Sequence, residues 1–133
     1  MTSKKLTRGL LFIAHGSNNA AATGEINNLV ELLKQNKTTQ MPAQIPYLIK
    51  VAFLEFAKPD IATAGGELIT QGVREIIVLP YFLAAGNHLQ IDIPRQLRLL
   101  QQQYPKVVIK TIPHIGSAAT LPELICGHLS KFM

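Results

Sequence analysis

Four runs of mostly apolar residues are separated along the chain by stretches in which apolar residues recur every three or four positions. The runs are rich in Ile, Val and Leu, which is typical of strands buried on both faces of a parallel sheet. They cover residues 10–14, 47–54, 76–82 and 107–112. We therefore predict four strands at these positions.

The intervening stretches have the periodicity of amphipathic helices. Their apolar positions are Ile26, Leu29, Val30 and Leu33 in the first, Ile61, Ala64, Leu68 and Ile69 in the second, Leu97 and Leu100 in the third, and Leu121, Leu124, Ile125, Leu129 and Phe132 in the last. Asp92, which precedes Ile93 and Pro94, has the position of an N-cap of the third helix. Thr120 and Glu123 have the spacing of a capping box at the start of the fourth.

Several single residues and one loop allow further predictions about packing and exposure. Gly65 and Gly66 lie inside the second helical stretch and predict a close contact with another element. Cys126 lies on the last helix and is interpreted as a small buried hydrophobic residue. His128 falls on the apolar stripe of the same helix and is interpreted as structural, and residues 34–46 predict an exposed loop.

The order of the elements defines the fold class. Four strands that alternate with four helices predict an α/β fold, in which a four-stranded parallel sheet has helices on both faces and right-handed crossovers. Ligands of such sheets bind beyond the carboxyl ends of the strands, where the strand order reverses. In a flavodoxin-like strand order this point lies between the first and third strands.

Composition and charge narrow the function classes. At 133 residues, 47% of them hydrophobic, the chain fits one globular domain over residues 1–133. No apolar stretch approaches the roughly 20 residues of a membrane span, so we expect no membrane partner. A single cysteine permits no internal disulfide, which predicts a reducing compartment, the cytoplasm.

The net charge of +5 favours an anionic partner. The basic residues are scattered, and no basic stripe is interleaved with aromatic side chains, so we do not expect nucleic acid. A polycarboxylate would satisfy the same charge.

Three polar side chains interrupt the apolar pattern where predicted strands end. His15 follows the first strand, Glu55 the second and His88 the third. Two imidazoles and a carboxylate at one edge of a sheet can hold a divalent metal ion and leave positions open for a substrate. Each residue also has a purely structural interpretation: His15 as a helix cap, His88 as a solvated loop residue and Glu55 as surface charge. Their coincidence at three strand ends favours the metal site.

Other chemistry has weaker support in the sequence. There is no GxGxxG, P-loop, HExxH or paired-cysteine motif. Ser17 lies near His15, but the GxSxG elbow of a serine hydrolase is missing. His114 follows the fourth strand and is a candidate for a supporting role at the same edge.

Three segments carry a family resemblance that covers nearly the whole chain. "LLFIAHGS", "VAFLEFAKPDI" and "IIVLPYFLAAGNHLQIDIP" resemble the signature segments of the short class II tetrapyrrole chelatases of the CbiX/SirB type. These enzymes insert a metal ion into sirohydrochlorin, and the chain would be a chelatase-like half-unit. One departure is visible: Asn18 and Asn19 stand where relatives commonly have a charged continuation, which argues against an arginine contact to substrate carboxylates at this point but not against the metal site.

The resemblance implies a specific chemistry. His15, His88 and Glu55 would be the catalytic and metal-binding residues, and they would bind the incoming Co²⁺, Fe²⁺ or Ni²⁺ or accept the protons that the macrocycle loses. No ATP or nucleotide would be needed, and the product would enter cobalamin or siroheme biosynthesis. The expected macrocycle wall consists of Phe82, Leu83, Leu89 and His114, with Ile91 beside them.

The resemblance also implies a homodimer, because longer members of this type join two such units in one chain. Two other functions stay open at this point. A non-catalytic tetrapyrrole or metal carrier would use the same fold and edge. A phosphate or nucleotide binder has less support, because no glycine-rich loop precedes a helix.

Overall fold

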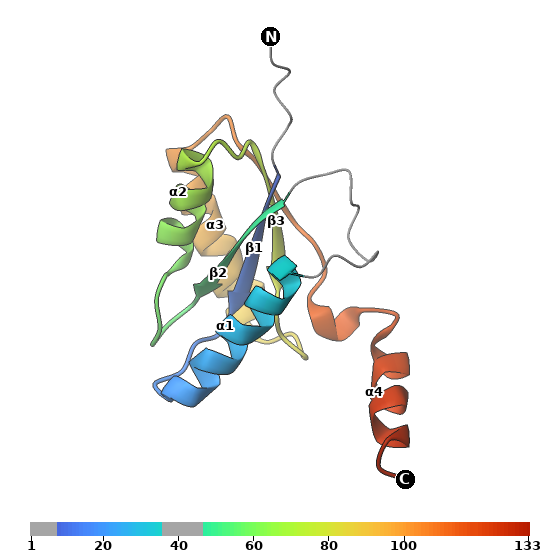
Figure 1. Cartoon of the computed structure of the whole chain (residues 1–133). Coiled ribbons are helices and arrows are strands. Elements are labelled where there is room, and N and C mark those ends of the chain that lie inside the picture. The colour runs from blue at the N-terminus through green and yellow to red at the C-terminus, as the bar shows by residue number, and fades with distance from the viewer. Residues whose placement is uncertain (1–7, 36–46) are drawn as a thin grey trace.

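The computed structural model describes residues 8–35 and 47–133 (Figure 1). The elements follow the predicted alternation of strands and helices. They are β1 (Arg8–Ala14), α1 (Ala20–Gln35), β2 (Tyr47–Phe53), α2 (Ile61–Thr70), β3 (Glu75–Pro80), a π-helical turn η1 (His88–Asp92), α3 (Ile93–Gln103), β4 (Val108–Thr111), a 3₁₀ turn η2 (Ile115–Ser117) and α4 (Leu121–Ser130). Most of the loop predicted over residues 34–46 lies outside the described residues.

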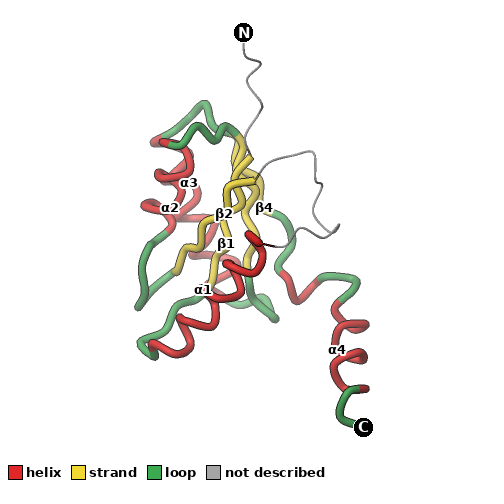
Figure 2. Tube along the Cα trace, in the orientation of Figure 1, coloured by secondary structure: helices red, strands yellow, loops and turns green. Residues whose placement is uncertain are grey.

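The four strands form one parallel sheet in the order β2-β1-β3-β4 (Figure 2). β1 therefore lies between β2 and β3. The chain adds β2 on one side of β1, and it adds β3 and then β4 on the other side. In the register, Ala14 pairs with Phe53 and Ile13 pairs with Pro80, so the three strands end at one edge. This confirms the predicted fold class and places the strand-order reversal between β1 and β3.

One face of the sheet carries the larger core. Helices α2 and α3 cover it and contact each other. Gly65 of α2 lies against Leu100 of α3, and a Cβ on this glycine would lie 2.6 Å from Leu100 Cδ2. The close contact predicted for the glycine pair is confirmed at Gly65. The buried residues of this core are Leu11, Ile13, Ala52, Ile61, Ala64, Leu68, Val73, Ile76, Val78, Ile93, Leu97, Leu100 and Val107.

The opposite face is covered by α1, which packs mainly over β2. Among the described residues, this smaller core buries only four side chains, those of Leu10, Phe12, Val30 and Ile49. The face is less covered toward β4, where Val108 is 48% exposed and Ile112 is 40% exposed. The two sides of the sheet are thus unequally protected from water.

Helix α4 departs from the expectation for the last helix. It lies beyond the carboxyl edge of the sheet (Figure 1), packs mainly against η2, and has no buried residue. The predicted burial of Cys126 is wrong, because this thiol is exposed. The amphipathic pattern predicts an apolar stripe correctly but cannot tell which surface covers it. Within the described ranges, no helix has the length and apolar character needed to cross a membrane.

Helix starts differ from the predicted caps. The Asp60 carboxylate accepts a hydrogen bond of 2.8 Å from the Thr63 amide and caps α2. This bond is the main reason why the pKa of Asp60 is lowered from its usual value. Asp92 and Thr120 stand at the predicted N-cap positions of α3 and α4, but neither side chain makes the cap bond expected of it. At Asp92 the physical reason is that π-turn η1 runs directly into α3 and the carboxylate has other partners.

Candidate metal centre

His15 is held at the end of β1 by a tight backbone turn. The next residue, Gly16, has φ +100°, a conformation that L side chains rarely adopt. A Cβ at Gly16 would also overlap the carbonyl oxygen of Glu55. The Glu55 amide donates to the carbonyl oxygen of His15 over 3.0 Å. Since β1 and β2 remain bonded beyond the sheet, the side chains of His15 and Glu55 are fixed side by side.

His88 reaches the same place from the far side of β1. Its Nε2 lies 3.8 Å from Glu55 Oε2, and His15 Nε2 lies 2.7 Å from the same oxygen. The two imidazole rings have centroids 4.4 Å apart and are tilted by 58°. One ligand atom from each of the three residues lies within 4.8 Å of the other two. The structure thus brings together the three side chains that the sequence singles out.

The ring nitrogen of His15 has an unusual environment. Its Nε2 is buried, and within the described residues it makes no hydrogen bond of acceptable geometry, although Glu55 Oε2 lies only 2.7 Å away. The contact has the distance of a hydrogen bond without its direction. A buried polar atom without a partner calls for a physical explanation. A divalent cation bound between the two histidines and the carboxylate would supply one.

The cluster is nevertheless open to solvent. The side chains of His15, Glu55 and His88 are between 41% and 45% exposed. A structural metal site is closed by protein ligands, whereas a site that exchanges its ion or acts on a substrate keeps free positions. Three candidate ligands at an exposed edge fit the second kind.

Sequence analysis missed the partner of His88. Its Nδ1 lies 2.7 Å from Asp92 Oδ2, and the other oxygen of Asp92 accepts a hydrogen bond of 3.0 Å from Arg95. With Nδ1–H donated to the carboxylate, Nε2 keeps its lone pair on the side of Glu55, where it is free to bind a cation. The spacing i,i+4 was a signal for this pair, but it was interpreted as helix capping.

Phe56 adds backbone strain beside the cluster. It is the non-glycine residue with a positive φ, 67°, in the described part of the chain. Its ring meets that of His15 in an edge-on arrangement with centroids 6.3 Å apart, and it is 59% exposed. Residues in such conformations concentrate at functional sites.

The residues expected to form a macrocycle wall have different environments. Phe82 and Leu89 pack partly against the larger core, whereas Leu83 is 74% exposed and Ile91 is 54% exposed. His114 is half-buried, and its carbonyl oxygen accepts bonds from Ser117. His114 does not belong to the three-residue cluster.

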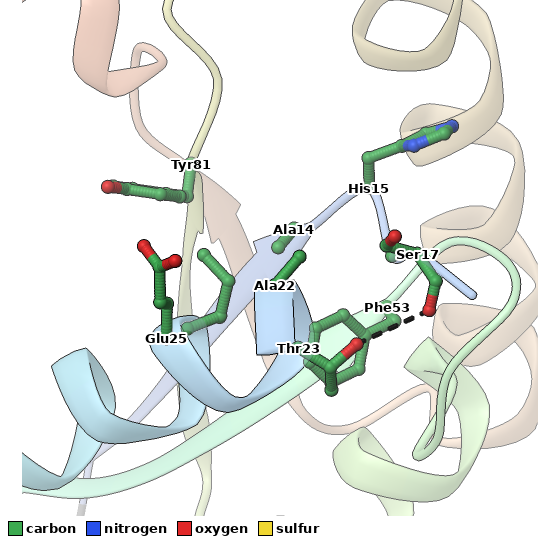
Figure 3. Close-up of a pocket in the computed structure, with 10 residues that line it drawn as sticks. Ala14, His15, Ser17, Ala22, Thr23, Glu25, Phe53 and Tyr81 are labelled. Atoms are coloured by element: carbon green, nitrogen blue, oxygen red, sulfur yellow. Dashed lines mark hydrogen bonds between the residues drawn. The ribbon is translucent and has the colours of Figure 1, made fainter. Parts of the chain in front are cut away.

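A pocket of about 330 Å³ adjoins His15 on the side of α1 (Figure 3). Figure 3 shows Glu25 and Tyr81 on one side of it, with His15 and Ser17 on the other. Its volume is at the lower end of the range for small-molecule sites. The full lining comprises Ala14, His15, Gly16, Ser17, Ala22, Thr23, Glu25, Ile26, Phe53 and Tyr81.

Comparison with known proteins gives the class to which this fold and site belong. The CbiX family model matches residues 9–131, and the chain belongs to the CbiX family. The match includes His15, Glu55 and His88. The resemblance inferred from the three sequence segments is confirmed.

Two curated relatives show how far the similarity extends. The chain is 33% identical over 98 residues to a sirohydrochlorin cobaltochelatase of Methanothermobacter thermautotrophicus, a match that covers 74% of this chain and 63% of that protein. It is 30% identical over 112 residues to a sirohydrochlorin ferrochelatase of Priestia megaterium, with coverage of 80% and 40%. The chain thus spans less than two thirds of the length of these relatives.

A solved structure has the same fold. The sirohydrochlorin chelatase SirB of Bacillus subtilis subspecies spizizenii, in complex with cobalt, matches with a TM-score of 0.80 at 23% identity. The match covers 96% of this chain and 51% of SirB. The described chain therefore has the architecture of about half of that protein.

Proposed function

We propose that this chain inserts a divalent metal ion into sirohydrochlorin. The observation that carries the proposal is the cluster of His15, Glu55 and His88, whose ligand atoms lie within 4.8 Å of one another at the carboxyl edge of the sheet. Membership of the CbiX family and the names of both curated relatives support it. The metal ion is a substrate of this reaction.

The three side chains have complementary tasks in the proposal. The Nε2 atoms of His15 and His88 bind the ion, and Glu55 approaches both rings with the same oxygen, Oε2. Two imidazoles and one carboxylate leave coordination positions free, so that the nitrogens of the macrocycle can replace water and then the protein ligands.

The proton balance gives the same residues a second role. When M²⁺ enters, two inner nitrogens of the macrocycle lose their protons, and the metal complex and two protons are the products. A carboxylate and imidazoles that have just released the ion are bases within reach of those protons. No electron is transferred and no phosphate bond is broken, so we propose that neither ATP nor another nucleotide takes part.

We propose that the macrocycle lies over the exposed apolar side chains next to the cluster. Leu83 has the side chain most available for this contact, because it is exposed, whereas Phe82 and Leu89 already pack against the core. The pocket beside His15 is too small for a whole tetrapyrrole and would accept one peripheral arm. The net positive charge of the chain suits the carboxylates of such a substrate.

The experiment is an anaerobic assay with purified protein, sirohydrochlorin and Co²⁺, Fe²⁺ or Ni²⁺ in turn, followed by the visible spectrum of the macrocycle. We expect insertion of at least one ion well above the rate of a protein-free control. Binding of the tetrapyrrole with insertion at the control rate would instead identify a carrier and would contradict the proposed activity.

We further propose that the protein acts as a homodimer in the cytoplasm. One sheet edge offers a single wall, and a second copy facing it would enclose the macrocycle from the other side. A single cysteine suits a reducing compartment. Light scattering after gel filtration tests the dimer: we expect twice the 14.6 kDa of one chain, and a fully active monomer would contradict it.

A substitution at the exposed Leu83 tests whether the dimer interface adjoins the His15–Glu55–His88 cluster. Leu83→Glu should lower dimer formation and activity together, because it places a charge between the two edges. Leu32, an exposed leucine of α1 at 63%, provides the matched control. An intact and active dimer of the Leu83 variant would place the interface elsewhere.

A further inference from the structure

Helix α4 presents an apolar stripe that its own sheet does not cover. Leu124, Ile125, Leu129 and Phe132 are 67%, 50%, 50% and 78% exposed. Leu124, Ile125 and Leu129 share one face of the helix, and Phe132 follows the end of the helix at Ser130. A contiguous apolar surface of this kind marks an interaction site when it occurs on a folded protein.

The same chain has an uncovered apolar area on the sheet. Val108 pairs with Glu75 and Lys110 pairs with Ile77 in the parallel register. Since Ile77 packs in the core beneath α1, Val108 and Ile112, which alternate with Ile109 and Thr111, face that side too. There α1 lies mainly over β2, and Val108 and Ile112 remain 48% and 40% exposed.

The position of α4 is fixed by the connection that precedes it. The Ile112 amide donates to the carbonyl of Val78 over 3.0 Å, and the Gly116 amide donates to the carbonyl of Phe82 over 2.9 Å. Gly116 lies so close to the Leu83 backbone that a Cβ would overlap it. The connection between β4 and α4, residues 112–120, is thus hydrogen-bonded to β3 and to the segment that follows β3. It directs α4 past the carboxyl edge of the sheet (Figures 1 and 2).

We propose that α4 of one copy packs on the β3–β4 half of the sheet of a second copy, on the side of α1, and that the partner returns the same contact. The apolar stripe and the apolar sheet area would then cover each other twice around a two-fold axis. Lys110, in the middle of that area, is paired, because its Nζ lies 3.3 Å from Glu75 Oε2, while Arg8 lies 2.7 Å from the other oxygen of the same carboxylate. The exchange completes the missing layer of each sheet.

The size of the contact favours a second copy as the occupant. Two stripes and the two sheet areas opposite them amount to on the order of 1,500 Å², within the range of about 1,200–2,000 Å² for stable interfaces. The direction of α4 also leads beyond the site edge, where the dimer proposed above places the partner. The inference rests on that dimer and is independent of the proposed chemistry.

Cross-linking of the whole protein, without metal or tetrapyrrole, tests the exchange. Cys126 is the only cysteine in the sequence, so Cys126→Ser provides a background without thiols. On it, Ile125→Cys in the stripe and Val108→Cys on the sheet are combined in one chain and treated with a short bismaleimide. We expect a cross-linked dimer on a denaturing gel. A cross-linked monomer, meaning that α4 folds onto its own sheet, or no cross-link would overturn the exchange.

Two controls separate the exchange from other dimers. Each cysteine is also introduced alone, and a cross-linked dimer from Ile125→Cys alone would indicate α4 against α4, which contradicts the proposal. Light scattering of the untreated protein reports the dimer itself, so a dimer without the 108–125 link refutes only the exchange.

A charge on the stripe gives a second readout. Leu124→Glu should convert the dimer into a monomer that keeps its circular dichroism spectrum, because no residue of α4 is buried within its own chain. Glu123→Gln, in the same turn but outside the stripe, is the matched control and should remain dimeric. An unchanged dimer of the Leu124 variant would contradict the proposal.

Discussion

His88 Nδ1 and Asp92 Oδ2 lie 2.7 Å apart, one turn from each other at the junction of η1 and α3. The carboxylate fixes the ring and the tautomer of a histidine whose other nitrogen points to Glu55. Asp92 is itself held by Arg95. The imidazole of His88, in the turn η1, is thus oriented by a carboxylate of the same turn, which Arg95 of α3 holds in place.

Asp92→Asn should weaken Co²⁺ binding by about 10- to 100-fold, as loss of such outer partners does. The fold should persist, because Asp92 makes no cap bond. Isothermal titration with Co²⁺ measures the affinity, and the exposed neighbour Gln90, changed to Ala, serves as control. Equal affinities of the two variants would show that Asp92 does not position His88.

Glu55→Gln should slow metal insertion less than loss of a histidine does, because water can accept the protons in its place. The amide still offers an oxygen to the ion but no longer a charge. Initial rates and the melting temperature should be compared with those of Glu31→Gln, an exposed glutamate of α1. If the Glu55 variant unfolds instead, the carboxylate is structural.

Gly16→Ala should destabilise the protein by more than about 1 kcal/mol, because alanine is strained at a positive φ and its Cβ would displace the Glu55 backbone. Gly24→Ala is the matched control. Gly24 lies inside α1 with open space at the Cβ position, so alanine should stabilise by about 0.5–1 kcal/mol. Urea unfolding measures both, and a neutral Gly16 variant would contradict the described turn.

Much of this arrangement follows from the sequence. Apolar runs and helical periodicity predict the order of the elements, and parallel topology then brings His15 and His88 to one edge. Asp92 has the predicted N-cap position, but its carboxylate pairs with His88, because one carboxylate at that position can serve a helix end or a histidine one turn away. Cys126 was misplaced because an amphipathic stripe specifies an apolar environment without saying whether the same chain provides it.

The α2 cap gives a pH-dependent prediction. Hydrogen bonding to Thr63 lowers the pKa of Asp60 in the folded state, so its stabilising effect is complete above the unfolded pKa and is lost as the pH falls through the folded pKa. Asp60→Ala should cost about 1 kcal/mol at neutral pH. Urea unfolding of both proteins from pH 7 to pH 3 should show the difference shrinking in acid, and a constant difference would exclude the ionised cap.

We propose that His88, with His15 and Glu55, delivers the metal ion. The most direct measurement is the initial rate of anaerobic insertion into sirohydrochlorin, with the ion that the wild type uses, for His88→Ala and Gln90→Ala at equal concentrations of folded protein. Both residues belong to η1, so the pair separates loss of the imidazole from disturbance of the turn. We expect the His88 variant to fall to the protein-free rate while the Gln90 variant keeps the wild-type rate. Near wild-type turnover by the His88 variant would contradict it.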